Sequence, residues 1–278
     1  MPVRGVLMLL MVVLLIRAPR AMAAGAEAAR LFVEAVLPGL FPYLVAAQML
    51  VSRMGPRPRP WQLMLLGWAG GSPTGARLAA LRPGMPLGQR RQLAVRCATL
   101  SPMFLSGTLG QWLGSPRAGA CVLAAVLLSG WLAGLALRGE EGAAGAETPP
   151  VRPMSLTECI AGGASAMLTA CGAMILMRVL AALLTEWTDA VCPALSLPLT
   201  TLLEVTTGAK AIAALPLPLM WRTALMAGAA GFGGASLLVQ VRAALGGEVL
   251  PLRTQVLRQG LHGTLAFLLA LGMAFFVL

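Results

Sequence analysis

Apolar runs long enough to approach a full crossing of a lipid bilayer recur along the whole chain, separated by short Arg-bearing connections. Crossing about 30 Å of hydrocarbon takes roughly 20 helical residues. Of the 278 residues, 58% are hydrophobic and 11% are charged, whereas an ordinary soluble domain has roughly 25% charged residues. Too little polar surface remains to cover a water-soluble globule. We therefore predict an all-α, polytopic integral membrane protein with the lipid bilayer as its partner.

The net charge of +11 would also suit a nucleic-acid-binding protein, but the Arg residues stand singly or in small groups at the ends of apolar runs. Cytoplasmic loops of membrane proteins concentrate Arg in this way, so we expect no nucleic-acid partner. The cysteines show no Cys-x-x-Cys spacing and mostly lie inside apolar runs (Cys97, Cys121, Cys159, Cys171 and Cys192). We expect neither a disulfide framework nor a metal site, and no cofactor.

The chain divides into two membrane halves with a polar linker between them. The predicted parts are an N-terminal transmembrane helix or signal-like segment (1–24), a first half (25–138), the linker (139–153) and a second half (154–278). About eight or nine membrane elements result. Ser155 and Glu158 form a capping box that predicts a helix start. We expect a break at Pro38 to Pro42 and an acidic turn that contains Glu186 and Asp189.

An interruption rich in glycine divides the apolar segment from Trp61 to Leu81, where the chain reads Gly70-Gly71-Ser72-Pro73-Thr74-Gly75. Arg residues flank this segment on both sides, so a full crossing would place one basic group outside, against the positive-inside bias. We therefore predict a re-entrant hairpin. The second half has a similar interruption from Gly228 to Ser236. Paired interruptions indicate a transporter's binding site, although glycines can also serve only close helix packing.

Charged residues inside apolar segments are candidates for function. Glu204 and Lys210 lie between Leu195 and Leu215, and a charge at mid-bilayer costs ~2.5 to 3.5 kcal/mol. We expect Gly208 to break this helix so that the two charges converge, the alternatives being a structural ion pair or a Lys that reaches the interface. For Arg178 we favour a side chain that reaches the interface over anion binding. Gln48, Ser101 and Gln240 are weaker candidates.

The predicted substrate-binding residues belong to the interruptions and to the segment around Glu204. They are Gly71, Ser72, Pro73, Thr74, Gly75, Thr99, Ser101, Glu204, Thr206, Thr207, Gly208, Lys210, Gly233, Gly234 and Ser236. No catalytic residue is assigned, because His262 and Asp189 have no partners at a catalytic spacing and no phosphate-binding loop is present. The chain is therefore not expected to be an enzyme.

Three separated motifs resemble one known family. Val36 to Leu44 reads VLPGLFPYL, Gly70 to Leu78 reads GGSPTGARL, and Leu203 to Gly208 reads LEVTTG. In order and spacing they are similar to the YlbJ (SpoVV) family of sporulation integral membrane proteins, within the nucleoside-recognition Gate-domain group. The resemblance covers nearly everything after residue 25. Family members commonly carry Asn before a Pro after the first hairpin, whereas this chain has Thr99 and Ser101 there and no Asn.

This resemblance implies a transporter with re-entrant hairpins that moves dipicolinate, a small aromatic dicarboxylate, across the outer forespore membrane; the cell membrane is the other expected location. The alternatives are a nucleoside or other small-solute carrier of the Gate-domain group, and a membrane scaffold in sporulation that transports nothing. A homo-oligomer is compatible with all three. On the leading hypothesis, hydroxyls and backbone amides of the interruptions hold the substrate carboxylates, and Lys210 adds a positive charge.

Overall fold

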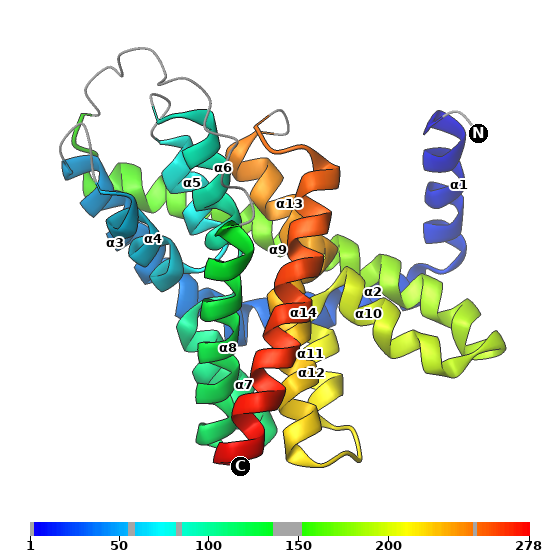
Figure 1. Ribbon diagram of the computed structural model, residues 1–278. Helices are drawn as coiled ribbons and strands as arrows, with labels where there is room; N and C mark the ends of the chain where they lie inside the picture. Colours follow the sequence, from blue (N-terminus) through cyan, green and yellow to red (C-terminus); the bar gives the residue numbers. More distant parts are fainter. Residues whose placement is uncertain (1–2, 55–58, 82–84, 136–151, 247–248) are drawn as a thin grey trace.

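The computed structural model describes residues 3–54, 59–81, 85–135, 152–246 and 249–278, and within them it is built of helices with no strand (Figure 1). Five helical stretches are long and apolar enough to cross a membrane: Ala18–Arg53, Pro116–Leu135, Leu156–Val191, Leu219–Leu245 and Leu252–Val277. This finding confirms the all-helical class and is compatible with a multi-pass integral membrane protein.

The helices fall into two series. The first comprises α1 (Val3–Ile16), α2 (Ala18–Leu31), a π-helical segment (Phe32–Val36), α3 (Leu37–Arg53), α4 (Pro60–Gly70), α5 (Thr74–Ala80), α6 (Leu87–Arg96), a second π-helical segment (Met103–Thr108), α7 (Leu109–Leu113) and α8 (Pro116–Leu135). The second comprises α9 (Leu156–Val191), a 3₁₀ turn (Pro193–Leu195), α10 (Ser196–Leu203), α11 (Val205–Ala213), α12 (Leu219–Phe232), α13 (Gly234–Leu245) and α14 (Leu252–Val277).

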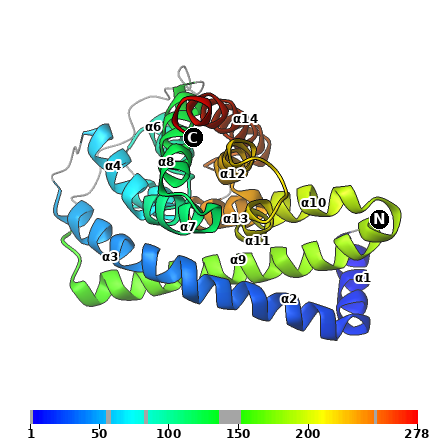
Figure 2. The same ribbon diagram turned by 90° about the horizontal axis from the view of Figure 1, so that it is seen from below.

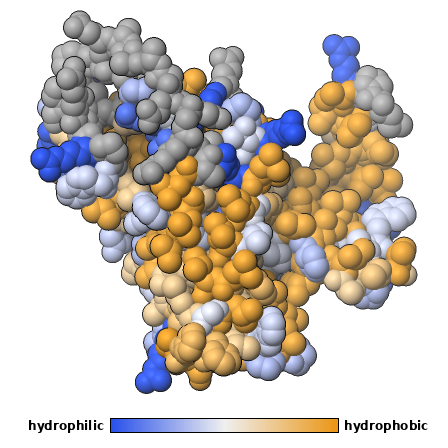
Figure 3. Space-filling model, viewed as in Figure 1, coloured by the Kyte–Doolittle hydropathy of each residue, from blue (hydrophilic) through white to orange (hydrophobic). Residues whose placement is uncertain are grey.

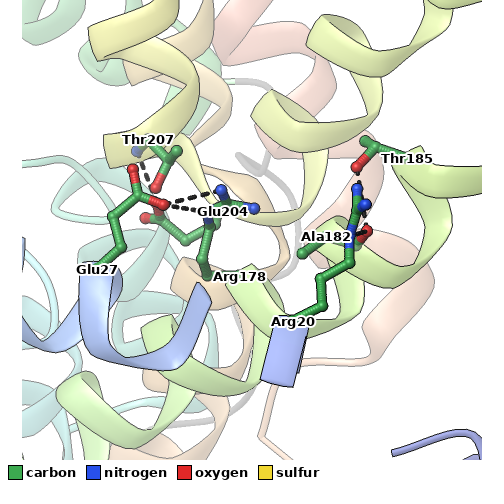
Figure 4. A network of polar contacts seen from close by, with 7 residues as sticks. All are labelled: Arg20, Glu27, Arg178, Ala182, Thr185, Glu204 and Thr207. Carbon is green, nitrogen blue, oxygen red and sulfur yellow. Dashed lines mark hydrogen bonds and ion pairs between the residues drawn. The ribbon is translucent and has the colours of Figure 1, made fainter. Parts of the chain in front are cut away.

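The two long helical stretches, α2–α3 and α9, lie side by side and run across the bundle of α8, α12 and α14 (Figures 1 and 2). They are antiparallel, since Arg20 near the start of α2 donates to the carbonyl of Ala182 late in α9, while Gly163 early in α9 faces Phe41 of α3. Arg178 pairs with Glu27 at 2.8 Å and thereby links the two helices (Figure 4). Arg178 therefore has a carboxylate partner, and the expectation that its side chain reaches the membrane interface stays a prediction.

The predicted break at Pro38 to Pro42 is also wrong, because the helix continues to Arg53. A proline inside a helix lacks an N–H donor and crowds the carbonyl four residues earlier. Here the π-helical segment comes immediately before Pro38, and the Leu37 N–H donates to the Phe32 carbonyl, five residues back. This wider turn absorbs the crowding that would otherwise break the helix.

The start of α9 agrees with the prediction. Glu158 N–H donates to Ser155 Oγ at 3.2 Å, and Ser155 N–H donates to Glu158 Oε2 at 2.8 Å, which completes the capping box. The predicted acidic turn is wrong, because α9 continues through Glu186 and Asp189 to Val191. Glu186 pairs with Arg17 at 3.0 Å, so its charge is used between helices. Most of the predicted linker (139–151) lies outside the described residues.

Helices α4 and α5 fold back on each other as a hairpin. A Cβ on Gly67 would lie 3.2 Å from the Cα of Gly75, which only two backbones in close contact allow. Helices α10 and α11 form a second hairpin, since a Cβ on Gly208 would lie 2.6 Å from the Cα of Thr201. The second hairpin turns at Glu204, which separates the two helices. The expected break at Gly208 is therefore wrong, because this glycine lies within α11 and serves close packing.

Each hairpin is followed by an interrupted helix. In the first series residues 97–102 separate α6 from the π-helical segment. In the second series Gly233, in the left-handed region at φ 77°, separates α12 from α13. The two glycine-rich motifs therefore have different roles, because Gly70 to Gly75 forms a hairpin turn whereas Gly228 to Ser236 contains a helix interruption. The element that corresponds in order to the first turn is Glu204.

Small and branched apolar side chains form the largest core cluster, where α8, α11, α12 and α14 pack together. The outer surface is also apolar. In Figure 3 apolar residues cover most of the face shown, and hydrophilic residues gather mainly toward its ends. Such a surface suits hydrocarbon as the surrounding solvent.

Candidate functional site

One cavity lies where both hairpin turns, both interruptions and both long helices meet. The turns contribute Ser72 and Glu204, the interruptions contribute Leu100 and Gly233, and Leu40 of α3 and Met167 of α9 are among the residues that line its sides. The cavity measures about 20 Å³, which is room for about one water molecule. We call it the central cavity. The structure is therefore closed around a site that joins both series.

The first turn is attached to the first interruption by backbone contacts. Ser72 N–H donates to the Thr99 carbonyl at 2.6 Å. Gly71, at φ 62°, lies so close that a Cβ there would be 2.6 Å from the Ser101 nitrogen, so only glycine fits. The Ser72 Oγ is buried, has no hydrogen-bond partner, and belongs to a residue of the cavity wall. It is the free polar group that the first turn contributes to the central cavity.

The other hydroxyls of the first series mostly serve the backbone. Thr74 Oγ1 donates to the Gly70 carbonyl at 3.0 Å, and Ser101 Oγ accepts from the Phe104 N–H at 3.2 Å. Thr99 Oγ1 is buried without a partner, but it is Leu100 of this segment that lines the cavity. The structure thus places these predicted residues beside the cavity and gives Thr74 and Ser101 local structural roles.

The second turn is organised by the fully buried side chain of Glu204. Its Oε1 accepts from Thr206 N–H at 2.9 Å. Its Oε2 accepts from Thr207 N–H at 2.7 Å, and Figure 4 shows this second bond. The carboxylate therefore caps the N-terminus of α11, where free amides and the helix dipole favour a negative charge. Thr206 lines the central cavity, and Thr207 Oγ1 is buried without a partner.

Lys210 does not join this site. Its side chain is exposed, near the C-terminal end of α11, and within the described residues the structure records no ion pair between it and Glu204. The two residues are six apart and α11 is regular between them, so they lie on different faces. The predicted convergence is wrong because the helix breaks at Glu204 itself.

The predicted glycines divide between packing and lining. A Cβ on Gly75 would lie 2.1 Å from that of Cys97, so Gly75 serves packing, as Gly208 does. Gly234, at φ 72°, packs against the second turn, with the Leu203 carbonyl and the Val205 nitrogen each 3.2 Å from a Cβ placed there. Gly233 and Ser236 line the central cavity. The interruption of the second series therefore holds the second turn, just as residues 97–102 hold the first.

A second, more open pocket of about 100 Å³ lies between α5, α9 and α13, and we call it the Arg77 pocket. Pro73 of the first turn and Ala166 line it, and Gln240 lines both this pocket and the central cavity. Arg77 was not among the residues predicted from the sequence to bind substrate. An Arg within one turn of an interrupted segment was the signal that could have revealed it.

Among the described residues no group of three His, Cys, Asp or Glu side chains comes together as a metal site would require. Comparison with protein-family models, curated proteins and solved structures finds no match. The geometry of the site and the sequence motifs are therefore the basis for a functional assignment.

Proposed function

We propose that the protein is a membrane transporter for a small solute, in which α4–α5 and α10–α11 are re-entrant hairpins. The observation that carries this proposal is the meeting of two helical turns and two helix interruptions at one cavity. A helix that ends inside a membrane leaves backbone groups unpaired at several kcal/mol each, which is tolerated where they line a cavity or bind a ligand. Transporters use such ends in pairs, one from each half.

The leading substrate class is a small aromatic dicarboxylate of the dipicolinate type, carried across the outer forespore membrane. The resemblance of three motifs to the YlbJ family supports this choice. Free buried hydroxyls on both hairpins, Ser72 Oγ and Thr207 Oγ1, are suited to donate to carboxylate oxygens. Glu204 is assigned a positioning role, since both of its oxygens are used by α11.

A neutral solute, such as a nucleoside, is the second candidate. It is favoured by the wall of the central cavity, which includes the Glu204 carboxylate and no Arg, Lys or His among the described residues. A carboxylate repels an anionic solute in a medium of low dielectric constant. The two candidates therefore differ in the charge of the molecule that occupies the central cavity.

Uptake by purified protein in liposomes tests the proposal. We expect uptake of labelled dipicolinate, excess uridine failing to compete, and a clear loss of uptake for Ser72→Ala and Thr207→Val. Thr264→Ala is the matched control, because this exposed hydroxyl only donates to the Gly260 carbonyl of its own helix. Uptake of uridine without dipicolinate would select the neutral-solute candidate. No uptake of either solute under any imposed gradient would leave a membrane scaffold as the function.

A further inference from the structure

The Arg77 pocket contains a guanidinium that has no acidic partner in the part of the chain that the structure describes. Arg77 lies on α5, one turn after the first hairpin turn, and its Nε is buried with no hydrogen-bond partner. No hydrogen bond or ion pair of its side chain is recorded with the described residues, whose acids are mostly occupied elsewhere. Glu27 pairs with Arg178, Glu158 with Arg152 and Glu186 with Arg17, Asp189 accepts from Ser196, and Glu204 caps α11.

Leaving a half-buried cation uncompensated is costly, because burial removes water that would otherwise solvate it. Structural arginines are therefore usually satisfied by carboxylates or carbonyls, as Arg178 and Arg20 are here. Arg77 instead lines a pocket of about 100 Å³. Its charge is therefore available to a ligand.

The neighbours of Arg77 keep this space polar and open. Gln48 Oε1, on α3, is also buried without a partner. A Cβ on Gly162 of α9 would lie 2.9 Å from Gln48 Oε1 and 3.0 Å from Arg77 Nη2, so both polar groups lie close over this glycine. Exposed hydroxyl residues of α9, Ser165 and Thr169, line the same pocket.

We infer that the Arg77 pocket is an anion-binding site that holds a carboxylate of the solute before it enters the central cavity; this inference rests on the proposed transport function. A planar guanidinium donates in a fork that matches the two oxygens of a carboxylate. The route onward is short, because Gln240 lines both spaces, and Pro73 and Ala166 of this pocket are chain neighbours of Ser72 and Met167 of the central cavity. Arg77 thus supplies, in the pocket that the solute reaches first, the positive charge that the described wall of the central cavity lacks.

Calorimetric binding of dipicolinate to the full-length protein in detergent tests the inference. We expect Arg77→Gln to bind about 10- to 100-fold more weakly than the wild type, from the loss of charge-assisted hydrogen bonds. Arg77→Lys should fall in between, because it keeps the charge and loses the fork. The matched control is Arg53→Gln, which removes an exposed Arg whose Nη1 donates to the Met49 carbonyl of its own helix. It should change binding by about twofold at most.

Gly162→Leu provides a test that leaves every charge in place. Its side chain would clash with the ends of the Arg77 and Gln48 side chains and displace them, so we expect binding to weaken about as much as in Arg77→Gln. Each variant is checked by size-exclusion profile and melting temperature. If Arg77→Gln fails to fold, Arg77→Lys and Gly162→Leu provide the test, and wild-type affinity in both variants would overturn the inference. If Arg77→Gln folds, equal affinities of Arg77→Gln and Arg53→Gln for dipicolinate would also overturn it.

Failure of the inference and failure of the proposed function remain distinguishable. If the wild type binds none of dipicolinate, benzene-1,3-dicarboxylate and benzoate, the anion site is wrong. Uridine uptake by the same preparation would then keep the transporter proposal with a neutral solute. Dipicolinate uptake that Arg77→Gln leaves unchanged would keep transport of the dicarboxylate and remove only the Arg77 site.

Discussion

The two hairpin turns occupy corresponding places in the two series yet satisfy their polar groups differently. The first turn uses its backbone, because Ser72 N–H donates to the Thr99 carbonyl of the neighbouring interruption. The second turn uses a side chain, because the Glu204 carboxylate accepts from two amides of its own helix. The first hairpin consequently keeps a free hydroxyl and a free guanidinium, at Ser72 and Arg77, whereas the charge of the second turn is already used.

Because their polar groups are satisfied differently, the two hairpins have unequal roles despite their similar backbone geometry. The second hairpin is stabilised from within, and on the proposed transport function the first hairpin carries most of the polar groups that are available to a solute. Similar backbone geometry in two halves therefore does not imply equal chemistry. The difference between the two halves lies in which polar atoms lack partners among the described residues, as Arg77 Nε does.

The largest expected effect comes from removing the Glu204 carboxylate. Glu204→Ala leaves the Thr206 and Thr207 amides without acceptors, and each unpaired buried group costs about 1–3 kcal/mol. We expect a clearly lower melting temperature in detergent and loss of uptake. Glu204→Gln keeps one acceptor oxygen, so its melting temperature and uptake should lie between those of the wild type and those of Glu204→Ala. Wild-type stability of Glu204→Ala would show that the second turn does not depend on its side chain.

Disturbing the close packing inside each hairpin should lower stability by a smaller amount, and rescue of that loss should differ between the two hairpins. Gly75→Ala and Gly208→Ala should each destabilise the protein by about 1–3 kcal/mol through overpacking. The clash of Gly75→Ala is with the Cys97 Cβ, so adding Cys97→Gly should restore much of the stability.

For the second hairpin the clash of Gly208→Ala includes the Thr201 Cα, so adding Thr201→Gly should restore less. Chemical or thermal unfolding of the four single variants, including Cys97→Gly and Thr201→Gly, and of the two double variants measures both coupling energies. Equal rescue in the two hairpins would contradict the packing described here.

The smallest expected effect belongs to Lys210, which is exposed and outside the central cavity. Lys210→Ala should change stability by less than about 0.5 kcal/mol, with uptake of dipicolinate near that of the wild type. The comparison with Arg77→Gln is informative, because both variants remove one positive charge from a hairpin. A loss of uptake as large as that of Arg77→Gln would place Lys210 on the solute route.

Charge placement and turn residues predicted part of this fold. Arg residues on both sides of Trp61 to Leu81 led to a hairpin, and the chain does fold back at Gly71, while the depth of that turn in a bilayer stays a prediction. Ser155 and Glu158 correctly marked a helix start. These signals are local, so they can be read from neighbouring residues alone.

The errors arose where distant contacts decide the outcome. Pro38 reads as a breaker, yet a π-helical turn before it lets the helix continue along α9. Glu204 reads as a charge that needs Lys210, yet its own helix supplies two amides. Whether Arg77 has a partner depends on which acids the fold brings near it. Periodicity and spacing contain no information of that kind.

The hydrogen bond from Ser72 to Thr99 has a consequence for motion. A single backbone hydrogen bond contributes about 0.5–1.5 kcal/mol net, which is no more than a few times the thermal energy. Detaching the first turn from its interruption would break this bond without unwinding either hairpin helix. The second turn is fixed by a buried carboxylate that accepts two hydrogen bonds, so opening it would cost more free energy. On the proposed transport function we therefore expect the first hairpin to act as the gate, and its opening rate to set how often the central cavity exchanges its content.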